Sequence, residues 1–158
     1  AAAAVASMDW DRLQDVAQAG NGTAFHLRPN LVPLSVPVDP VEKITIPSFS
    51  PGFLLDNVLS KEACRKLIEV AENIGFATRW SSTLGVVTFF MDEEFERNLF
   101  ERMQPHLPGA VGGKPVGIQR RWAVIKYEPG QYMNTHIDGH VPGTMRNGDQ
   151  LQYAPGTR

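Results

Sequence analysis

Two stretches of the chain carry apolar residues at the three- and four-residue spacing of an amphipathic helix. The first predicts a helix from Ser60, a favourable N-cap, through Ile74, with Gly75 at a position where helices often end. The second predicts a helix from Asp92 to about Gln104. The two apolar stripes are formed by Ala63, Leu67, Val70, Ala71 and Ile74, and by Phe95, Leu99 and Met103. Each stripe is expected to face the protein core.

Shorter apolar segments bounded by turn residues predict strands. These segments are Lys43 to Ile46, Gly52 to Asp56, Gly85 to Met91 and Gln119 to Glu128. Pro129 and Gly130 then suit a type II turn, because proline supplies a fixed φ and glycine tolerates a positive one. A further strand from Tyr132 to Asp138 is expected to pair across this turn. Helices first and paired strands last indicate an α+β fold.

The first 40 residues differ in composition from the rest of the chain. They begin with an alanine-rich stretch and contain four prolines that disfavour regular strand pairing, namely Pro29, Pro33, Pro37 and Pro40. At most one short helix, between Asp9 and Ala19, is predicted there. We therefore expect two parts, a poorly ordered alanine- and proline-rich leader over residues 1–40 and a folded domain over residues 41–158.

Composition narrows the class of protein. The chain has 158 residues, of which 42% are hydrophobic and 20% charged, as is typical of a globular domain. Its net charge of -2 argues against a nucleic-acid partner, and no run of 18 apolar residues predicts a membrane span. Cys64 is the only cysteine, which excludes an internal disulfide and a cysteine-based zinc cluster and favours a reducing compartment. Because it lies beside the stripe of the first helix, Cys64 is expected to be buried.

Candidate chemistry is concentrated in the triplet His136-Ile137-Asp138. On a strand, residues two apart point to the same face, roughly 6–7 Å apart along the backbone, so both side chains can reach one ion. Imidazole plus carboxylate, completed by a second imidazole, is the ligand set that holds iron(II) in oxygenases. Alone, the triplet also fits a solvated surface histidine beside an aspartate. The preceding turn, the adjacent Gly139 and the upstream Tyr127 favour a metal site instead.

Residues 121–139 resemble the N-terminal half of the iron(II)- and 2-oxoglutarate-dependent dioxygenase domain, of the prolyl 4-hydroxylase-like kind. The resemblance rests on an apolar strand ending in Tyr127, a glycine turn, and then His136 and Asp138. The segment from Phe53 to Ile68, a short strand followed by a capped helix, resembles the start of that domain, so the matches cover about residues 50–140. The resemblance implies N-terminal helices packed on a double-stranded β-helix, or jelly-roll, core that is incomplete in this chain.

The resemblance also implies a function. His136 and Asp138 would be two of three iron ligands, and Tyr127 would hydrogen-bond 2-oxoglutarate. The implied activity is hydroxylation of a C–H bond, with peptidyl proline as the family-level substrate and succinate and CO2 as co-products. Fe(II) and 2-oxoglutarate are then required, and ascorbate is the expected reductant. The family's distal histidine and its basic residue for 2-oxoglutarate have no match in the sequence, so we expect the 158-residue chain to be poorly stable and inactive alone.

Two other functions fit the same residues. A zinc-dependent hydrolase would use His136, Asp138 and His140, although His136 and His140 would lie roughly 13 Å apart on a regular strand, which favours a rim position for His140. A non-catalytic interaction module would keep the fold without the site. His26 and His106 are expected in loops, with solvated side chains. The expected partner is a peptide, protein or small-molecule substrate, in the cytoplasm or, by analogy with prolyl hydroxylases, in the ER lumen.

Overall fold

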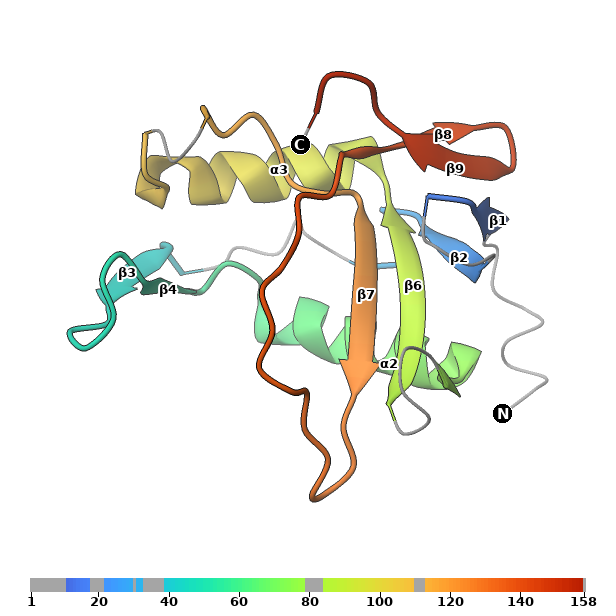
Figure 1. Ribbon diagram of the computed structural model, residues 1–158, viewed down its shortest axis with the longest axis horizontal. Coiled ribbons are helices and arrows are strands. Elements are labelled where there is room, and N and C mark those ends of the chain that lie inside the picture. Colours follow the sequence, from blue (N-terminus) through green and yellow to red (C-terminus); the bar gives the residue numbers. More distant parts are fainter. Residues whose placement is uncertain are drawn as a thin grey trace.

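The computed structural model describes residues 11–17, 22–29, 31–32, 39–78, 84–109 and 113–157 and shows a mixed α+β fold (Figure 1). Within these residues, two helices accompany a curled main sheet and a separate two-stranded hairpin. The helices are α2 (Lys61–Ile74) and α3 (Glu93–Met103), followed by a short 3-10 helix, η1 (Gln104–His106). The strands are β1 (Arg12–Asp15), β2 (Gly22–Leu27), β3 (Glu42–Thr45), β4 (Phe53–Asp56), β5 (Ala77–Thr78), β6 (Gly85–Met91), β7 (Arg121–Lys126), β8 (Thr144–Asn147) and β9 (Gln150–Tyr153).

Strand β6 is the centre of the main sheet. Strand β7 pairs antiparallel along one edge of β6, from Gly85 opposite Lys126 to Phe90 opposite Arg121. The other edge is shared by β5, which pairs with the start of β6, and by β2, which pairs parallel with its end. From β2 the sheet continues through β1 and β9 to β8. The apolar run of β6 fits this position, because a strand covered on both faces can be apolar along its whole length.

Both helices confirm the prediction from the apolar periodicity. The N-terminus of α2 is capped by Ser60, whose hydroxyl oxygen accepts the N–H of Ala63 at 3.0 Å. The helix ends at Gly75, whose φ of 88° is a conformation that favours glycine. The N-terminus of α3 is capped by Asp92, whose carboxylate accepts the N–H of Glu94 at 2.9 Å. Neither helix of the described residues has the length and apolar character needed to cross a bilayer.

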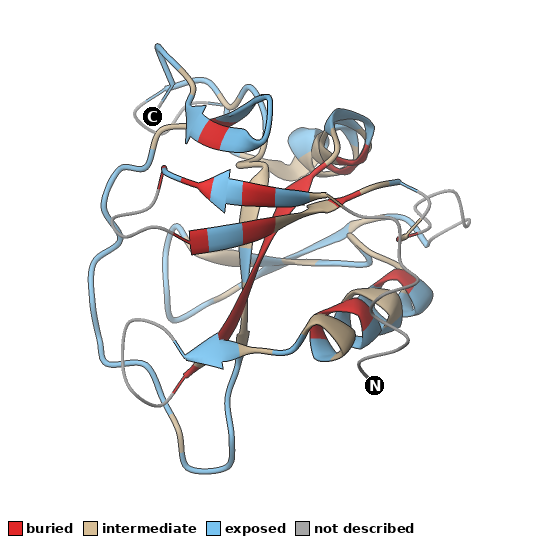
Figure 2. Ribbon diagram, turned by 90° about the vertical axis from the view of Figure 1, so that its right-hand side faces the viewer, coloured by how far each residue is buried: buried red, intermediate tan, exposed pale blue. Residues whose placement is uncertain are grey.

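The two helices pack on one face of the sheet. Their main cluster of buried residues consists of Leu27, Val32, Ala63, Val70, Ala71, Val87, Phe89, Met91, Phe95 and Leu99. A second, smaller cluster is formed by Leu13, Ala24, Phe90 and Leu151. The neighbours Phe89 and Phe90 belong to different clusters because successive side chains of a strand point to opposite faces. Figure 2 shows β6 buried along most of its length, as a strand with a core on each face should be.

A contact between distant strands shows that the main sheet curls into a half-barrel. Arg121 Nη1 of β7 lies 3.6 Å from Asp15 Oδ1 of β1, although β6 and β2 lie between these strands. In a flat sheet, β7 and β1 would be about 14 Å apart, since neighbouring strands are about 4.8 Å apart. The two residues are also several positions apart along the strands, so curvature is needed to bring them together. Both side chains therefore lie on the concave face.

Two strands come from the segment that we expected to be a leader. The helix predicted between Asp9 and Ala19 was wrong over its described part, because Arg12–Asp15 forms β1. In β1, burial alternates from residue to residue, with Leu13 and Asp15 buried. Pairing with β2 and β9 determines this conformation, and these contacts are not visible in a local helix pattern. Within this segment, residues 1–10, 18–21, 30 and 33–38 lie outside the described part of the chain.

The turn after β7 forms as the sequence predicted. Gly130 has a φ of 87°, as the third position of a type II turn requires. The turn is closed by Gln131, whose N–H donates to the carbonyl of Glu128 at 2.9 Å. Pro129 therefore occupies the second position, where its fixed φ is compatible with the turn.

The strand that we predicted after this turn, from Tyr132 to Asp138, is not formed, and that prediction was wrong. Residues 131–143, called the 131–143 segment below, have no regular secondary structure and lead from the turn to β8 (Figure 1). The segment is largely exposed. In the described residues no strand pairs with this segment, so its backbone lacks the ladder hydrogen bonds that would make it a strand.

Candidate functional site

The 131–143 segment brings the predicted ligand pair together. His136 Nε2 lies 3.1 Å from Asp138 Oδ1. The side chain of His136 is 51% exposed and that of Asp138 is 93% exposed, so both are open to an ion or a ligand from solvent. The predicted common direction of the two side chains is therefore present, although an irregular segment provides it instead of a strand.

The imidazole ring of His136 is oriented by the backbone. Its Nδ1 lies 2.8 Å from the carbonyl oxygen of Asn134. Because a carbonyl can only accept, Nδ1 carries a proton, and Nε2 is the nitrogen that faces Asp138. The hydrogen bond to Asn134, followed by the negative charge of Asp138, raises the pKa of His136 above its ordinary value of 6.5. When the ring is protonated, the Nε2–H therefore donates to Asp138 and joins the two side chains.

The same geometry suits a metal ion. Two donor atoms that each lie about 2.1 Å from one metal and occupy neighbouring octahedral positions are about 3.0 Å apart. The separation of 3.1 Å between His136 Nε2 and Asp138 Oδ1 agrees with this value. A histidine that ligates through one nitrogen usually donates its other N–H to a carbonyl or carboxylate, as His136 does to Asn134. The pair can therefore exchange its shared proton for a divalent cation.

His140 does not join this pair. Across the described residues, no three histidine, cysteine, aspartate or glutamate side chains lie close enough together to hold a metal ion. The arrangement of His136, Asp138 and His140 that a zinc hydrolase would need is therefore not formed in this structure. Two protein ligands, His136 and Asp138, are what the described residues offer to a metal.

Tyr127 lies directly after β7 and is 44% exposed. We expected two paired strands to bring its phenol towards His136. Because the second strand is not formed, that reason for proximity no longer holds. In the described part of the chain, Tyr127 makes no hydrogen bond to His136 or Asp138.

Both ends of the 131–143 segment are anchored. At the upstream end, the side-chain oxygen of Gln131 accepts the N–H of Glu128 at 2.8 Å. At the downstream end, the side-chain amide of Gln119 donates to the carbonyl of Pro142 at 2.7 Å. Gly143 donates its N–H to the hydroxyl oxygen of Thr157. The contact of Gln119 could not be predicted from the sequence, because a polar residue at the start of a strand gives no signal of a distant carbonyl partner.

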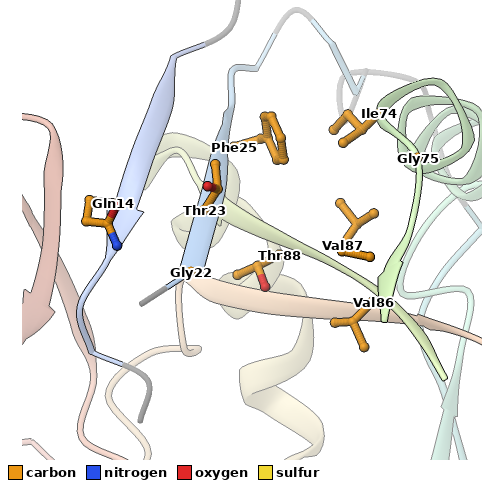
Figure 3. Close-up of a pocket in the computed structure, with 10 residues that line it drawn as sticks. Gln14, Gly22, Thr23, Phe25, Ile74, Gly75, Val86, Val87 and Thr88 are labelled. Atoms are coloured by element: carbon orange, nitrogen blue, oxygen red, sulfur yellow. The ribbon is translucent and has the colours of Figure 1, made fainter. Parts of the chain in front are cut away.

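Two cavities in the described part of the chain lie away from the ligand pair. One cavity of about 320 Å³ borders the downstream end of the 131–143 segment and is lined in part by Gln119, Arg120, Val141, Gly143, Thr144 and Thr157. Another, of about 340 Å³, lies between β2, β6 and the end of α2, with Phe25, Ile74 and Val87 along it (Figure 3). Neither is lined by His136, Asp138 or Tyr127, so the pair is a surface site.

His26 does not lie in a solvated loop as we expected. It lies on β2, and its side chain is only 13% exposed. Its Nδ1 is 3.5 Å from Asp11 Oδ2 and its Nε2 is 3.7 Å from Asp92 Oδ2. Arg146 on β8 contacts the same ring, with Nη1 3.0 Å from Nδ1. This polar cluster links β2 to the start of α3 and to β8.

Cys64 is exposed, so the prediction that it is buried was wrong. The buried residues of α2 are Ala63, Val70 and Ala71, which lie on one side of the helix. Cys64 instead lines an open cavity of about 430 Å³, together with Leu99, Met103 and Trp122.

The site can be interpreted from its donor atoms alone. It offers one imidazole nitrogen, one carboxylate and open approach from solvent, which suits a divalent cation with free coordination positions.

A comparison with family models, with curated proteins and with solved structures found no match to this chain.

Proposed function

We propose that the protein is an iron(II)- and 2-oxoglutarate-dependent dioxygenase that hydroxylates a C–H bond, with peptidyl proline as the favoured substrate. The observation that carries the proposal is the 3.1 Å separation of His136 Nε2 and Asp138 Oδ1 on an exposed segment. The resemblance of residues 121–139 to prolyl 4-hydroxylase-like domains adds the choice of metal and cosubstrate.

Each residue of the site has a defined part in this proposal. His136 and Asp138 hold the iron, and the carbonyl of Asn134 keeps the ring of His136 oriented. Bound iron(II) and 2-oxoglutarate supply the oxidising chemistry, in which O2 and 2-oxoglutarate are consumed and succinate and CO2 are released. Tyr127 is the proposed hydrogen-bond donor to 2-oxoglutarate, and ascorbate keeps the iron reduced.

A jelly-roll core is part of the same proposal. The curled α+β sheet supports it, because barrel closure requires a sheet that is already curved. In the described residues, β7 pairs with β6 alone and β8 with β9 alone, so both strands are edges of the half-barrel. Such edges are where further strands of a barrel would add.

Metal binding is the direct test. We would titrate the chain with Mn(II), a redox-stable substitute for Fe(II), and follow paramagnetic broadening of the NMR signals of His136 and its neighbours. The expected result is broadening centred on residues 136–138, lost in His136→Ala and in Asp138→Ala. His140→Ala is the matched control and should bind as the wild type does. Equal binding by His136→Ala and the wild type would contradict the proposal.

The cosubstrate and the zinc alternative can be tested on the same proteins. Without oxygen, Fe(II) and 2-oxoglutarate together should give the visible charge-transfer absorption of a 2-oxoglutarate–iron chelate, absent in Asp138→Ala. A zinc hydrolase would instead require His140. Loss of metal binding in His140→Ala would therefore favour that alternative. If the wild type binds neither Fe(II) nor zinc, a non-catalytic interaction module is the better explanation.

A further inference from the structure

Gln119 is hydrogen-bonded on both sides of its side-chain amide. Its Nε2 donates to the carbonyl of Pro142 at 2.7 Å, and its Oε1 accepts the N–H of Arg121 at 3.4 Å. The two partners fix the orientation of the amide, because a carbonyl can only accept and a backbone N–H can only donate. Gln119 is half-buried and lies two residues before β7. It therefore attaches the 131–143 segment to the start of a central strand pair.

The position of the ligand pair depends on the few hydrogen bonds that join the 131–143 segment to the rest of the fold. Among the described residues from 132 to 141, the hydrogen bonds are local ones, between His136 and Asn134 and between His136 and Asp138. After Asp138, the first hydrogen bond to the rest of the fold is the one from Gln119 to the carbonyl of Pro142, four residues downstream. Because so few hydrogen bonds restrict this segment, each one has a large effect on its conformation.

The neighbouring anchor does not replace this bond. Gly143 bonds to Thr157 and Ala154, which follow β9 in the chain. These contacts join the segment to the β8–β9 hairpin, which pairs with β1 at only two positions, Gln14 with Gln150 and Asp15 with Leu151. In the described residues, Gln119 supplies the link from the downstream end of the segment to the β6–β7 side of the sheet.

We propose that Gln119 is a positioning residue for the metal pair, acting through the carbonyl of Pro142. It does not touch the metal, and the inference rests on the proposed function of His136 and Asp138. Without the bond, the downstream end of the segment gains conformational freedom, and binding a metal must restrict that freedom again. A neutral hydrogen bond contributes about 1 kcal/mol, so we expect Mn(II) affinity to fall roughly five- to tenfold.

Two substitutions separate the two bonds of the amide. Gln119→Glu keeps the acceptor for the N–H of Arg121 and loses the donor to Pro142. Gln119→Met has a similar length and loses both. Gln152→Ala, an exposed glutamine on β9, is the matched control. Mn(II) affinity and thermal unfolding would be measured for the full chain and each variant, with the affinity measured well below the unfolding temperature.

The inference predicts that Gln119→Glu and Gln119→Met both bind Mn(II) roughly five- to tenfold more weakly, while Gln152→Ala binds as the wild type does. It is overturned if Gln119→Glu retains full affinity, because the Pro142 bond is then irrelevant. It is equally overturned if both variants unfold at lower temperature without a change in affinity, which is the signature of a purely structural role. If the wild type binds no Mn(II) at this pair, the proposed function itself fails, and the inference fails with it.

Discussion

The buried pair of Asp15 and Arg121 provides a demanding test of the half-barrel. Asp15 is 0% exposed, and the described residues give neither of its carboxylate oxygens a hydrogen-bond partner. In the described part of the chain, its cationic partner is Arg121, whose Nη1 lies at 3.6 Å and whose side chain is 11% exposed. We predict that Arg121→Met destabilises the protein severely, because it leaves a carboxylate buried without a counter-charge.

The size of the effect follows from the distance. At 3.6 Å and an effective dielectric constant of about 20, two unit charges attract by about 4.6 kcal/mol. Removing one partner of a buried pair costs about 3–5 kcal/mol in measured cases. Most domains have only about 5–15 kcal/mol of total stability, so Arg121→Met should move the urea unfolding midpoint substantially.

The assay is urea unfolding, followed by tryptophan fluorescence and by far-UV circular dichroism. The double variant Asp15→Leu with Arg121→Met should recover most of the loss, because an apolar pair of similar size removes the stranded charge. Lys126→Met is the control, since its ion pair with Glu72 is exposed and screened by solvent and should contribute little to stability. A loss below about 1 kcal/mol in Arg121→Met would refute the reasoning and, with it, the approach of β7 to β1.

Three further predictions follow from other parts of the structure. Phe89→Ala should cost about 3–5 kcal/mol of unfolding free energy, because Phe89 is fully buried in the main core, and chemical denaturation would measure this. Ser60→Ala should cost about 1 kcal/mol, since the N-terminal N–H groups of α2 lose an acceptor, whereas Ser60→Asp should keep the cap. In the metal-free chain, NMR titration should give His136 a pKa above 6.5, and Asp138→Asn should lower that pKa. The ion pair of these two residues is therefore formed below the ordinary histidine pKa and lost as the pH rises through the raised one, so metal affinity should increase over the same range.

Local signals were sufficient for the elements whose ends and faces are set by their own residues. Ser60 and Gly75 mark the ends of α2 because capping depends on neighbouring backbone groups. The mostly apolar run from Gly85 to Met91 indicated β6, since a short run rich in β-branched and aromatic residues is typical of a strand buried on both faces. Pro129 and Gly130 determined their turn through their own backbone preferences.

Elements that depend on distant partners were predicted poorly. The helical spacing around Leu13 was misleading, because β1 is stabilised by pairing with β2 and with β9, which is far away in the sequence. Tyr132 to Asp138 was predicted as a strand from its position after a turn, but it has no partner strand in the described residues. Pairing energy comes from the neighbouring strand, so no property of the segment alone could decide either case.

The sequence by itself determined the two helices, the central strand, the turn and the neighbouring placement of His136 and Asp138, because each depends on side chains a few positions apart. Tertiary structure alone decided that the sheet curls until Arg121 meets Asp15, and that Gln119 reaches Pro142. It also decided that the ligand pair lies on an exposed irregular segment instead of a strand. These contacts join residues far apart in the chain, and their formation depends on how the whole sheet packs.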